Sequence, residues 1–332
     1  MALLRRTVLL SLAAASFSAC AATPLPGTEE LVGPDEVAPL WTQGVPGGVP
    51  DGLAEHIVLR DNPFGLLDRA AHDVTLPSLS IFRPRRADGS AILIIPGGGY
   101  KWVVIDKEGF EGARHFCGQG ATVYVLRYRL PHQGWAASAE APLQDAQRAV
   151  RVIRSRASAD GIDPARVMVV GFSAGGHVAG SLASRFDAEV HPAQDGIDLL
   201  AARPDAAALI YPVATMARPY AHEGSRLNLL GAEPSSEAVR AWSLEHMVRP
   251  DMPPVFLLHA GDDAAVPVEN SLMLYSALRA SGVPAVLHVF EAGGHGFGLR
   301  GIKGTPLEVW PRLLLQWSAS KGIHVKRSVS RQ

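Results

Sequence analysis

Residues 171–175, with the sequence GFSAG, could present a nucleophilic serine at Ser173. They follow an apolar run at 167–170 and lead into a segment of small residues. A serine at the tip of a tight strand-to-helix turn sits in a strained backbone conformation, and its neighbours must have almost no side chain. Gly171 and Gly175 meet that requirement. A glycine-rich turn without chemistry would look the same, so the motif needs partners elsewhere in the chain.

A histidine and a carboxylate are the partners that such a serine needs. The histidine takes the proton of the serine, and the carboxylate fixes the tautomer of the histidine. The apolar run 255–258 leads to an acidic loop with Asp262 and Asp263, and the run 285–290 leads to a glycine-rich loop with His295. Taken singly, these could be ordinary turn and loop residues. Together, each at the end of an expected strand, they predict a catalytic triad.

Of the two aspartates, we choose Asp263 as the triad acid because it lies four residues before Pro267. Asp262 is then a turn former. The chain order is serine, aspartate, histidine, which is the order in α/β-hydrolases and differs from that in chymotrypsin and subtilisin. Ser173, Asp263 and His295 therefore predict acyl transfer by nucleophilic catalysis.

Backbone amides must stabilise the oxyanion in such a reaction, and a second glycine-rich loop could supply them. The apolar run 91–95 is followed by PGGGY at 96–100. We expect the donors to be the amides of Gly98, Gly99 and Ala174, and a merely flexible turn is the alternative. The loop lacks the G-x-x-x-x-G-K-[ST] pattern of phosphate loops, and no dinucleotide fingerprint opens a helix. A nucleotide cofactor is therefore not expected.

The composition is that of a globular enzyme. The chain has 332 residues, of which 47% are hydrophobic and 19% charged, with a formal net charge of −1. This length suits one α/β domain with short extensions, or two small domains. No basic patch or acidic block stands out, so nucleic acid is not an expected partner. No H-E-x-x-H, clustered Cys/His or EF-hand spacing occurs, and we expect no metal or other cofactor.

The amino terminus has the pattern of an export signal. An apolar stretch at 3–17 includes Arg5 and Arg6 near its start and is too short for a standard membrane span. We interpret residues 1–22 as a signal peptide or lipoprotein signal. The residues before Cys20 resemble a lipobox, so Cys20 could carry a lipid anchor, and simple cleavage is the alternative. Either route predicts an exported protein that is periplasmic, secreted or an outer-membrane lipoprotein.

Apolar runs alternate with helix patterns over most of the chain. This alternation predicts a mostly parallel, doubly wound α/β sheet with helices on both faces, and a ligand site beyond the carboxyl ends of the strands. The clearest helix spans 142–157, and a second covers 268–278. The expected strands are 74–82, 91–95, 122–128, 166–170, 206–211, 255–260 and 285–290.

The remaining segments complete the expected organisation. Residues 23–50 are rich in Pro and Gly and predict a tether or an arm lying over the core. The catalytic domain should span 51–322, followed by a basic tail at 323–332. Residues 212–252 lack strand signals and predict a loop-rich cap insertion over the site. Their charged and polar content argues against the apolar lid of a lipase.

Several polar residues have no assigned chemistry. Asp145 and Arg148 lie three apart on the clear helix and are interpreted as a surface or helix-anchoring pair. Lys107 and Glu108 follow the oxyanion loop closely enough that a role in the site competes with an ordinary surface pair. Tyr100 could pack beside that loop or touch substrate.

Several blocks of this sequence resemble the bacterial acetylxylan esterase-like branch of the α/β-hydrolases. That branch includes enzymes that act on acetyl and feruloyl esters of plant cell-wall polysaccharides. The likeness runs from about residue 40 to residue 317 and implies the same triad. The blocks that carry it are PGGGY at 96–100, DKEG at 106–109, YRLP at 128–131, PLQDAQRA at 142–149, GFSAGGH at 171–177, HEGSRLNLLG at 222–231, DDAAVPVENS at 262–271 and GGHGFG at 293–298.

The function expected from residues and resemblance together is a serine carboxylesterase that removes short acyl groups, acetyl above all, from a carbohydrate such as xylan. A general short-chain esterase or lipase remains an alternative. So does a peptidase of the prolyl oligopeptidase type, although the chain has no room for the propeller domain usual in that class. A non-catalytic carbohydrate-binding protein on a hydrolase fold is the alternative from another class, and it would be expected to lack part of the triad or oxyanion loop.

Overall fold

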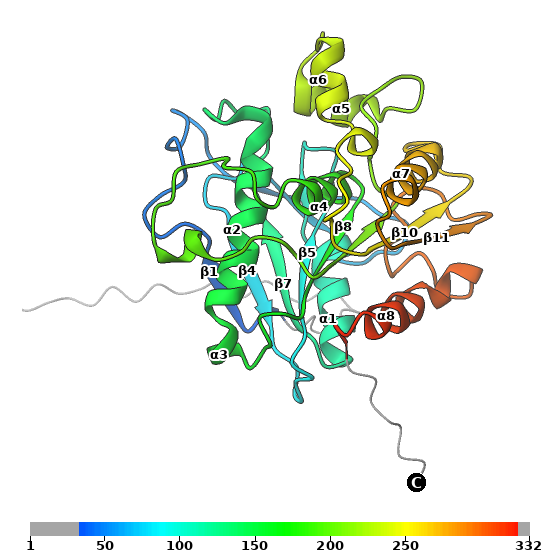
Figure 1. Ribbon diagram of the computed structural model, residues 1–332, viewed down its shortest axis with the longest axis horizontal. Coiled ribbons are helices and arrows are strands. Elements are labelled where there is room, and N and C mark those ends of the chain that lie inside the picture. The colour runs from blue at the N-terminus through cyan, green and yellow to red at the C-terminus, as the bar shows by residue number, and fades with distance from the viewer. Residues whose placement is uncertain (1–32, 325–332) are drawn as a thin grey trace, which may run out of the picture. The chain divides into compact units, whose positions relative to one another are not determined.

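An eight-stranded, mostly parallel sheet forms the centre of the computed structural model, which describes residues 33–324 (Figure 1). The strand order is β1-β4-β7-β5-β8-β9-β10-β11, and only the pairs β1 with β4 and β4 with β7 are antiparallel. The bounds are β1 Glu36–Pro39, β4 Ser78–Phe82, β5 Ala91–Ile95, β7 Thr122–Arg127, β8 Val167–Phe172, β9 Ala206–Ile210, β10 Val255–Ala260 and β11 Ala285–Phe290.

Continuous apolar runs become the central strands because both faces of a parallel sheet are covered. Every residue of β5, β8, β9 and β10 is buried. Six of the seven expected strands lie within two residues of their expected bounds. The strand expected at 74–82 begins only at Ser78, because Pro77 cannot donate a hydrogen bond to a neighbouring strand.

Helices cover both faces of the sheet, as expected (Figure 1). Alternate residues of β5 point into two separate apolar cores, Leu93 into one and Ile92 into the other. The first core includes residues of α2, α4 and α7, and the second includes residues of α1 and α8. The bounds of these helices are α1 Glu111–Gly118, α2 Ala141–Ser155, α4 Ala174–Ser184, α7 Glu269–Ala280 and α8 Trp310–Ser320, and a short helix α3, Ala157–Asp160, follows α2.

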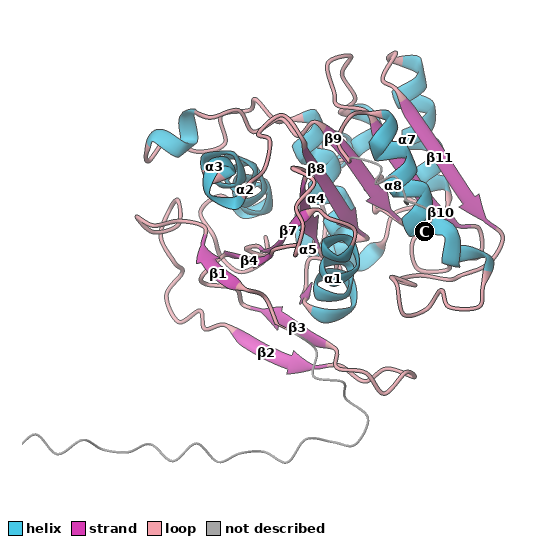
Figure 2. Cartoon of the chain, turned by 90° about the horizontal axis from the view of Figure 1, so that it is seen from below, coloured by secondary structure: helices cyan, strands magenta, loops and turns pink. Residues whose placement is uncertain are grey.

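A small antiparallel sheet was not expected from the sequence. It consists of β2 His56–Leu59, β3 Arg69–His72 and β6 Val103–Val104, in the order β2-β3-β6. Figure 2 shows β2 and β3 beside β1. The strands are two to four residues long, and most of β2 is exposed, so they lack the apolar alternation that marks a strand in sequence.

The segment expected as a tether is part of the folded unit from Gly33 onward. Strand β1 pairs with β4 at the edge of the sheet, and Leu40 and Trp41 are buried in the core. One aromatic and one aliphatic side chain thus anchor this segment to the core despite its Pro and Gly content. The signal segment 1–22, with Cys20, and most of the basic tail lie outside the described residues.

The cap at 212–252 is rich in loops, as expected, and it also contains two short helices and a 3₁₀ turn that the sequence did not predict. It contains α5 Glu223–Leu230, α6 Ser236–Ala241 and a 3₁₀ turn at Leu244–His246. The side chains of His222 and Ser235 cap the first two helices by accepting backbone hydrogen bonds. Within residues 33–324, each helix is too short or too polar to span a bilayer.

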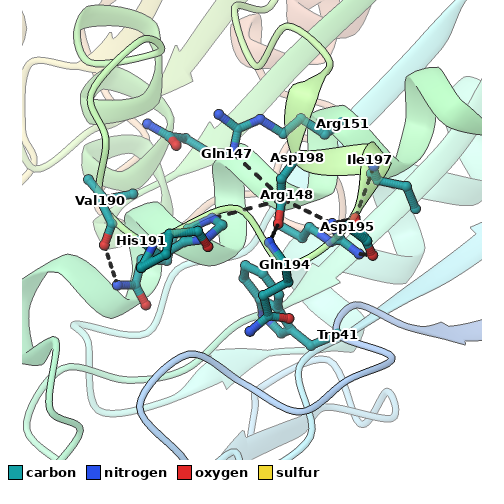
Figure 3. A network of polar contacts seen from close by, with 12 residues as sticks. Trp41, Gln147, Arg148, Arg151, Val190, His191, Gln194, Asp195, Ile197 and Asp198 are labelled. Carbon is teal, nitrogen blue, oxygen red and sulfur yellow. Dashed lines mark hydrogen bonds and ion pairs between the residues drawn. The ribbon is translucent and has the colours of Figure 1, made fainter.

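Asp145 and Arg148 are buried and do not form the surface pair that their spacing suggests. The Asp145 carboxylate accepts hydrogen bonds from the Trp41 indole at 2.7 Å and the Arg129 guanidinium at 2.8 Å. Arg129 and Asp145 have no exposed side-chain surface. Arg148 bonds instead to Asp195, at 2.6 Å, and to a second aspartate, Asp198 (Figure 3). The contacts with Trp41 and Asp195 connect α2 with residues more than 40 positions away on either side, which the spacing of one helix cannot reveal.

Replacing Asp145 with alanine should destabilise the protein by about 3–5 kcal/mol, because it leaves the Arg129 charge buried and unpaired. Urea unfolding followed by circular dichroism would measure the loss. Asp187→Ala is the control, since Asp187 forms an exposed ion pair with Arg249 and such pairs contribute at most about 1 kcal/mol. Equal losses in the two variants would contradict this account.

Candidate active site

Ser173 lies in the turn between β8 and α4 with strained backbone angles, φ 52° and ψ −119°. The turn is as tight as the sequence motif predicts. A Cβ atom on Gly171 would lie 2.3 Å from the carbonyl oxygen of Gly175, and one on Gly175 would lie 2.2 Å from the carbonyl oxygen of Ile95. No residue larger than glycine fits at either position without moving the backbone, so α4 can approach β5 and β8 closely and hold Ser173 at the carboxyl end of the sheet.

Ser173, His295 and Asp263 form a continuous chain of contacts. The Ser173 Oγ lies 2.9 Å from His295 Nε2, and His295 Nδ1 lies 2.7 Å from Asp263 Oδ2. An ionised Asp263 can only accept, so Nδ1 carries the proton and Nε2 is free to accept the serine hydroxyl. The structure therefore brings together the three residues proposed from the sequence in the geometry of a nucleophile, a base and an orienting carboxylate.

The Asp263 carboxylate is fully buried and saturated with donors. Its Oδ1 accepts hydrogen bonds from the amides of Ala265 and Val266, at 3.0 and 2.8 Å. A second buried histidine, His259, places its Nε2 3.3 Å from Oδ2. Burial alone raises the pKa of Asp263, but the bonds from His259 and His295 outweigh it and hold the pKa well below its usual range. Asp263 is thus a carboxylate at every pH at which the protein would work.

The neighbouring Asp262 has a different task. Its Oδ1 accepts the amides of Gly293 and Gly294, both at 2.8 Å, and so supports the loop that contains His295. It makes no contact with the imidazole among the bonds of the described residues. The geometry accordingly favours Asp263 as the acid and Asp262 as the turn former.

The glycine-rich loop after β5 lies against Ser173. Gly98 has φ 131° and Gly99 φ 64°, and a Cβ on Gly98 would lie 2.4 Å from the carbonyl oxygen of Trp102. Within residues 33–324, the amides of Gly98 and Gly99 donate to no protein acceptor. Ala174 is the first residue of α4 and lacks a side-chain cap, so its amide is also available. Three amides without a protein acceptor therefore lie on the oxyanion loop and directly after Ser173.

Glu108 supports the oxyanion loop through hydrogen bonds, a role that the sequence alone did not decide. It belongs to a single turn of π-helix, Asp106–Phe110, and its buried carboxylate accepts the amide of Gly97 at 2.8 Å. The other oxygen accepts the Tyr211 hydroxyl at 3.1 Å, and that hydroxyl accepts the amide of Gly298 at 3.2 Å. Burial raises the pKa of Tyr211, so the phenol keeps its proton and donates it to Glu108. This chain of bonds connects the oxyanion loop to the histidine loop.

Tyr100 is buried and lies outside the pocket. Its hydroxyl lies 2.6 Å from His177 Nδ1, and His177 Nε2 donates to the carbonyl of Trp242 at 2.7 Å. Since Nε2 must carry the proton, Nδ1 accepts from the tyrosine. Burial lowers the pKa of His177 to about 4. Of the two roles left open for Tyr100, the structure supports packing, and the residue helps to join the oxyanion loop to the cap.

A polar pocket of about 370 Å³ surrounds Ser173 and His295. The cap contributes His222 and Asn228, and Asn228 Nδ2 donates to the carbonyl of Gly99 at 2.8 Å. From the sequence, this part of the cap indicated only a polar cover and a family resemblance, and no site residue was expected there. Within the part of the chain that the structure describes, no group of three His, Cys, Asp or Glu residues could hold a metal. The other lining residues are Arg60, Gly98, Gly99, Lys101, Trp102, Val104, Lys107, Glu108, Gly224 and Gly296.

Comparison with known proteins identifies the family. Residues 79–278, more than half of the chain, match the BD-FAE family. The chain belongs to this family. It is 40% identical over 205 residues to Endo-1,4-beta-xylanase B of Butyrivibrio fibrisolvens, which aligns 62% of this chain with 32% of that protein. It is 33% identical over 221 residues to an acetylxylan esterase of Xylanibacter ruminicola, with 65% and 43% covered. The chain thus spans less than half the length of these two relatives.

A solved structure supports the same grouping. The acetyl ester-xyloside bifunctional hydrolase from Caldicellulosiruptor lactoaceticus superposes with a TM-score of 0.71 and 34% identity, and the alignment covers 89% of this chain and all of that one. The α/β-hydrolase fold and the resemblance to acetylxylan esterase-like proteins are thereby confirmed for this BD-FAE member.

Acid should destabilise the protein through His177. In the unfolded chain the histidine gains a proton below about pH 6.5, whereas in the fold it resists protonation until about pH 4. The contribution of His177 to stability is therefore constant above pH 6.5. It is lost as the pH falls from 6.5 to about 4, by about 3 kcal/mol in total. His177→Gln should lose less stability than the wild type between pH 7.5 and pH 4.5 in urea unfolding. An identical loss in both proteins would refute the role of His177.

Proposed function

We propose that this protein is a serine esterase that removes short acyl groups, acetyl above all, from a carbohydrate such as xylan. The observation that carries the proposal is the chain of contacts from Ser173 through His295 to Asp263 inside one pocket. The names of the relatives add support, since one is an acetylxylan esterase and another hydrolyses acetyl esters and xylosides. No cofactor takes part in the proposed reaction.

The first half of the reaction forms an acyl-enzyme. Ser173 Oγ attacks the ester carbonyl while His295 Nε2 takes its proton. The negative charge moves to the carbonyl oxygen, where the amides of Gly98, Gly99 and Ala174 stabilise it. Asp263 stabilises the imidazolium that forms. The ester bond then breaks as His295 returns the proton to the departing sugar oxygen.

The second half releases the acid. Water enters the place of the sugar, and His295 takes a proton from it as the oxygen attacks the acyl carbon. The same three amides stabilise the second oxyanion, and collapse of this intermediate restores Ser173 and frees acetate. One histidine therefore serves as base and acid in alternation, which requires that Asp263 keep it in a single tautomer throughout.

The substrate class is supported by the character of the pocket. Eight of its fourteen lining residues have polar or charged side chains, Trp102 is its one large aromatic side chain, and its cap side is formed by His222, Gly224 and Asn228. A long acyl chain would need an apolar channel, whereas hydroxyl groups of a sugar need donors and acceptors. Export through residues 1–22, with or without a lipid on Cys20, would bring the enzyme to extracellular or periplasmic polysaccharide fragments.

Ser173→Ala should reduce kcat/KM for p-nitrophenyl acetate by about 10⁴-fold or more, because triad residues act as a unit. Asp263→Asn should lose a similar factor through the wrong tautomer of His295. Asp262→Asn is the matched control, and it should retain most activity because Asp262 contacts only backbone amides. Unfolding midpoints would establish that each variant is folded.

Two results would count against this assignment. More than a tenth of the wild-type rate in folded Ser173→Ala would remove the serine as nucleophile. A larger loss in Asp262→Asn than in Asp263→Asn would move the triad acid to Asp262.

Acetate esters should exceed butyrate esters by at least tenfold in kcat/KM, and octanoate should scarcely be turned over. A methylene forced into a filled pocket costs roughly 1–3 kcal/mol of transition-state binding. The measurement compares the three p-nitrophenyl esters and adds acetate release from acetylated xylan. Octanoate cleavage as fast as acetate cleavage would favour a general esterase or lipase. Cleavage of prolyl peptides would favour a peptidase, and xylan binding without turnover would favour a carbohydrate-binding protein.

A further inference from the structure

We propose that the natural substrate carries a carboxylate close to the scissile ester, and that Arg60, Lys101 and Lys107 bind it. The ligand class is an acylated carbohydrate with a uronic acid substituent. This inference rests on the proposed esterase function and names the substrate of the same pocket more narrowly.

The three cations come from separate segments and line one pocket. Arg60 follows β2 of the small sheet, Lys101 follows the oxyanion loop, and Lys107 lies in the π-helical turn next to Glu108. All three line the same 370 Å³ pocket as Ser173. Three like charges repel one another, so placing them together carries an energetic cost that an anionic ligand would remove.

No protein carboxylate neutralises these cations. Among the described residues, Arg60 and Lys107 form no ion pair, and Lys101 contacts only the Trp102 ring, with its Nζ 4.6 Å from the ring centroid. Arg60 and Lys107 are half-buried and Lys101 is exposed, so the three charges are accessible to a molecule in the pocket.

The carboxylate nearest to the cations is already engaged. Glu108 lines the pocket, but its two oxygens accept the Gly97 amide and the Tyr211 hydroxyl. Asp263 lies behind His295 and is bonded to it. The positive charge of Arg60, Lys101 and Lys107 thus remains directed at whatever occupies the pocket.

The residues that the cap contributes to the pocket are neutral, in contrast to the three cations. His222 Nδ1 accepts the amide of Ser225 at 3.1 Å, so its proton resides on Nε2. Burial lowers the pKa of His222, and the imidazole is uncharged. Asn228, on the same helix, is also neutral. An acidic substituent would turn toward the three cations, and the ester to be cleaved would be selected by its position relative to that substituent.

The test compares two substrates that differ only in charge. One is an acetylated xylo-oligosaccharide with a glucuronic acid branch, and the other is the same compound with that carboxylate converted to a carboxamide. Acetate release gives kcat/KM for each. We expect the acid to be preferred by about tenfold in 20 mM salt, the size of one charged hydrogen bond. The preference should fall toward unity in 0.5 M NaCl, because salt screens exposed charges.

Substitutions of the cations test whether they cause the preference for the acid over the carboxamide. Lys107→Gln and Arg60→Gln should each reduce the preference ratio by about threefold or more. Lys321→Gln, which removes an exposed lysine just after α8 and away from the pocket lining, should leave the ratio at the wild-type value. The salt dependence of the wild type needs no variant and provides an answer even where a substitution impairs folding.

The outcomes separate this inference from the function on which it rests. Suppose that the protein cleaves p-nitrophenyl acetate and also releases acetate at equal rates from the glucuronic acid substrate and its carboxamide. That result would overturn the carboxylate site but not the esterase function. A preference that is unchanged in both pocket variants would also overturn it. Failure to cleave p-nitrophenyl acetate, the glucuronic acid substrate and its carboxamide would overturn the proposed esterase function, and the carboxylate site with it.

Discussion

The close approach of α4 to β5 and β8 constrains the rest of the site. A Cβ on Gly175 would lie only 2.2 Å from the Ile95 carbonyl oxygen, so the first turn of α4 sits directly on the end of β5. The oxyanion loop begins directly after Ile95, and a Cβ on Gly97 would lie 2.8 Å from the Cβ of Ser173. One contact therefore sets both the nucleophile and the loop that faces it. The strain at Ser173 persists because the packed backbone on both sides leaves it no alternative.

Two chains of hydrogen bonds connect the turn at Ser173 to more distant parts of the site. Glu108 and Tyr211 join the oxyanion loop to the loop that contains His295, and Tyr100 and His177 join it to the cap. Each connection uses a buried polar group whose partners are all protein atoms. A buried polar chain is costly when it is incomplete, which makes its intact form specific for one arrangement of loops. The positions of base, donors and cap are thus coupled, although they come from distant parts of the chain.

The sequence predicted the strongest features of the fold and the site because they are local. Ser173, Asp263 and His295 each follow a continuous apolar run, and the ends of parallel strands meet at one edge of a sheet. Features that depend on long-range contacts escaped prediction. Asp145 and Arg148 looked like a helix-surface pair, yet each bonds to residues that only the tertiary fold brings near. The short strands of the small sheet have too few residues to display a period.

The small sheet positions residues of the pocket around Ser173, although its short strands give no signal in the sequence. Strand β6 carries the chain from the oxyanion loop into the π-helical turn, and β3 pairs with β6 and with β2. Arg60, at the end of β2, and Lys107, in the turn, are thereby brought to one pocket with Ser173. The residues proposed to perform chemistry follow strands of the parallel sheet, whereas those proposed to face the substrate lie on short peripheral elements. Peripheral elements can change with little cost to the core, so differences in substrate among proteins of this fold should concentrate in the small sheet and the cap.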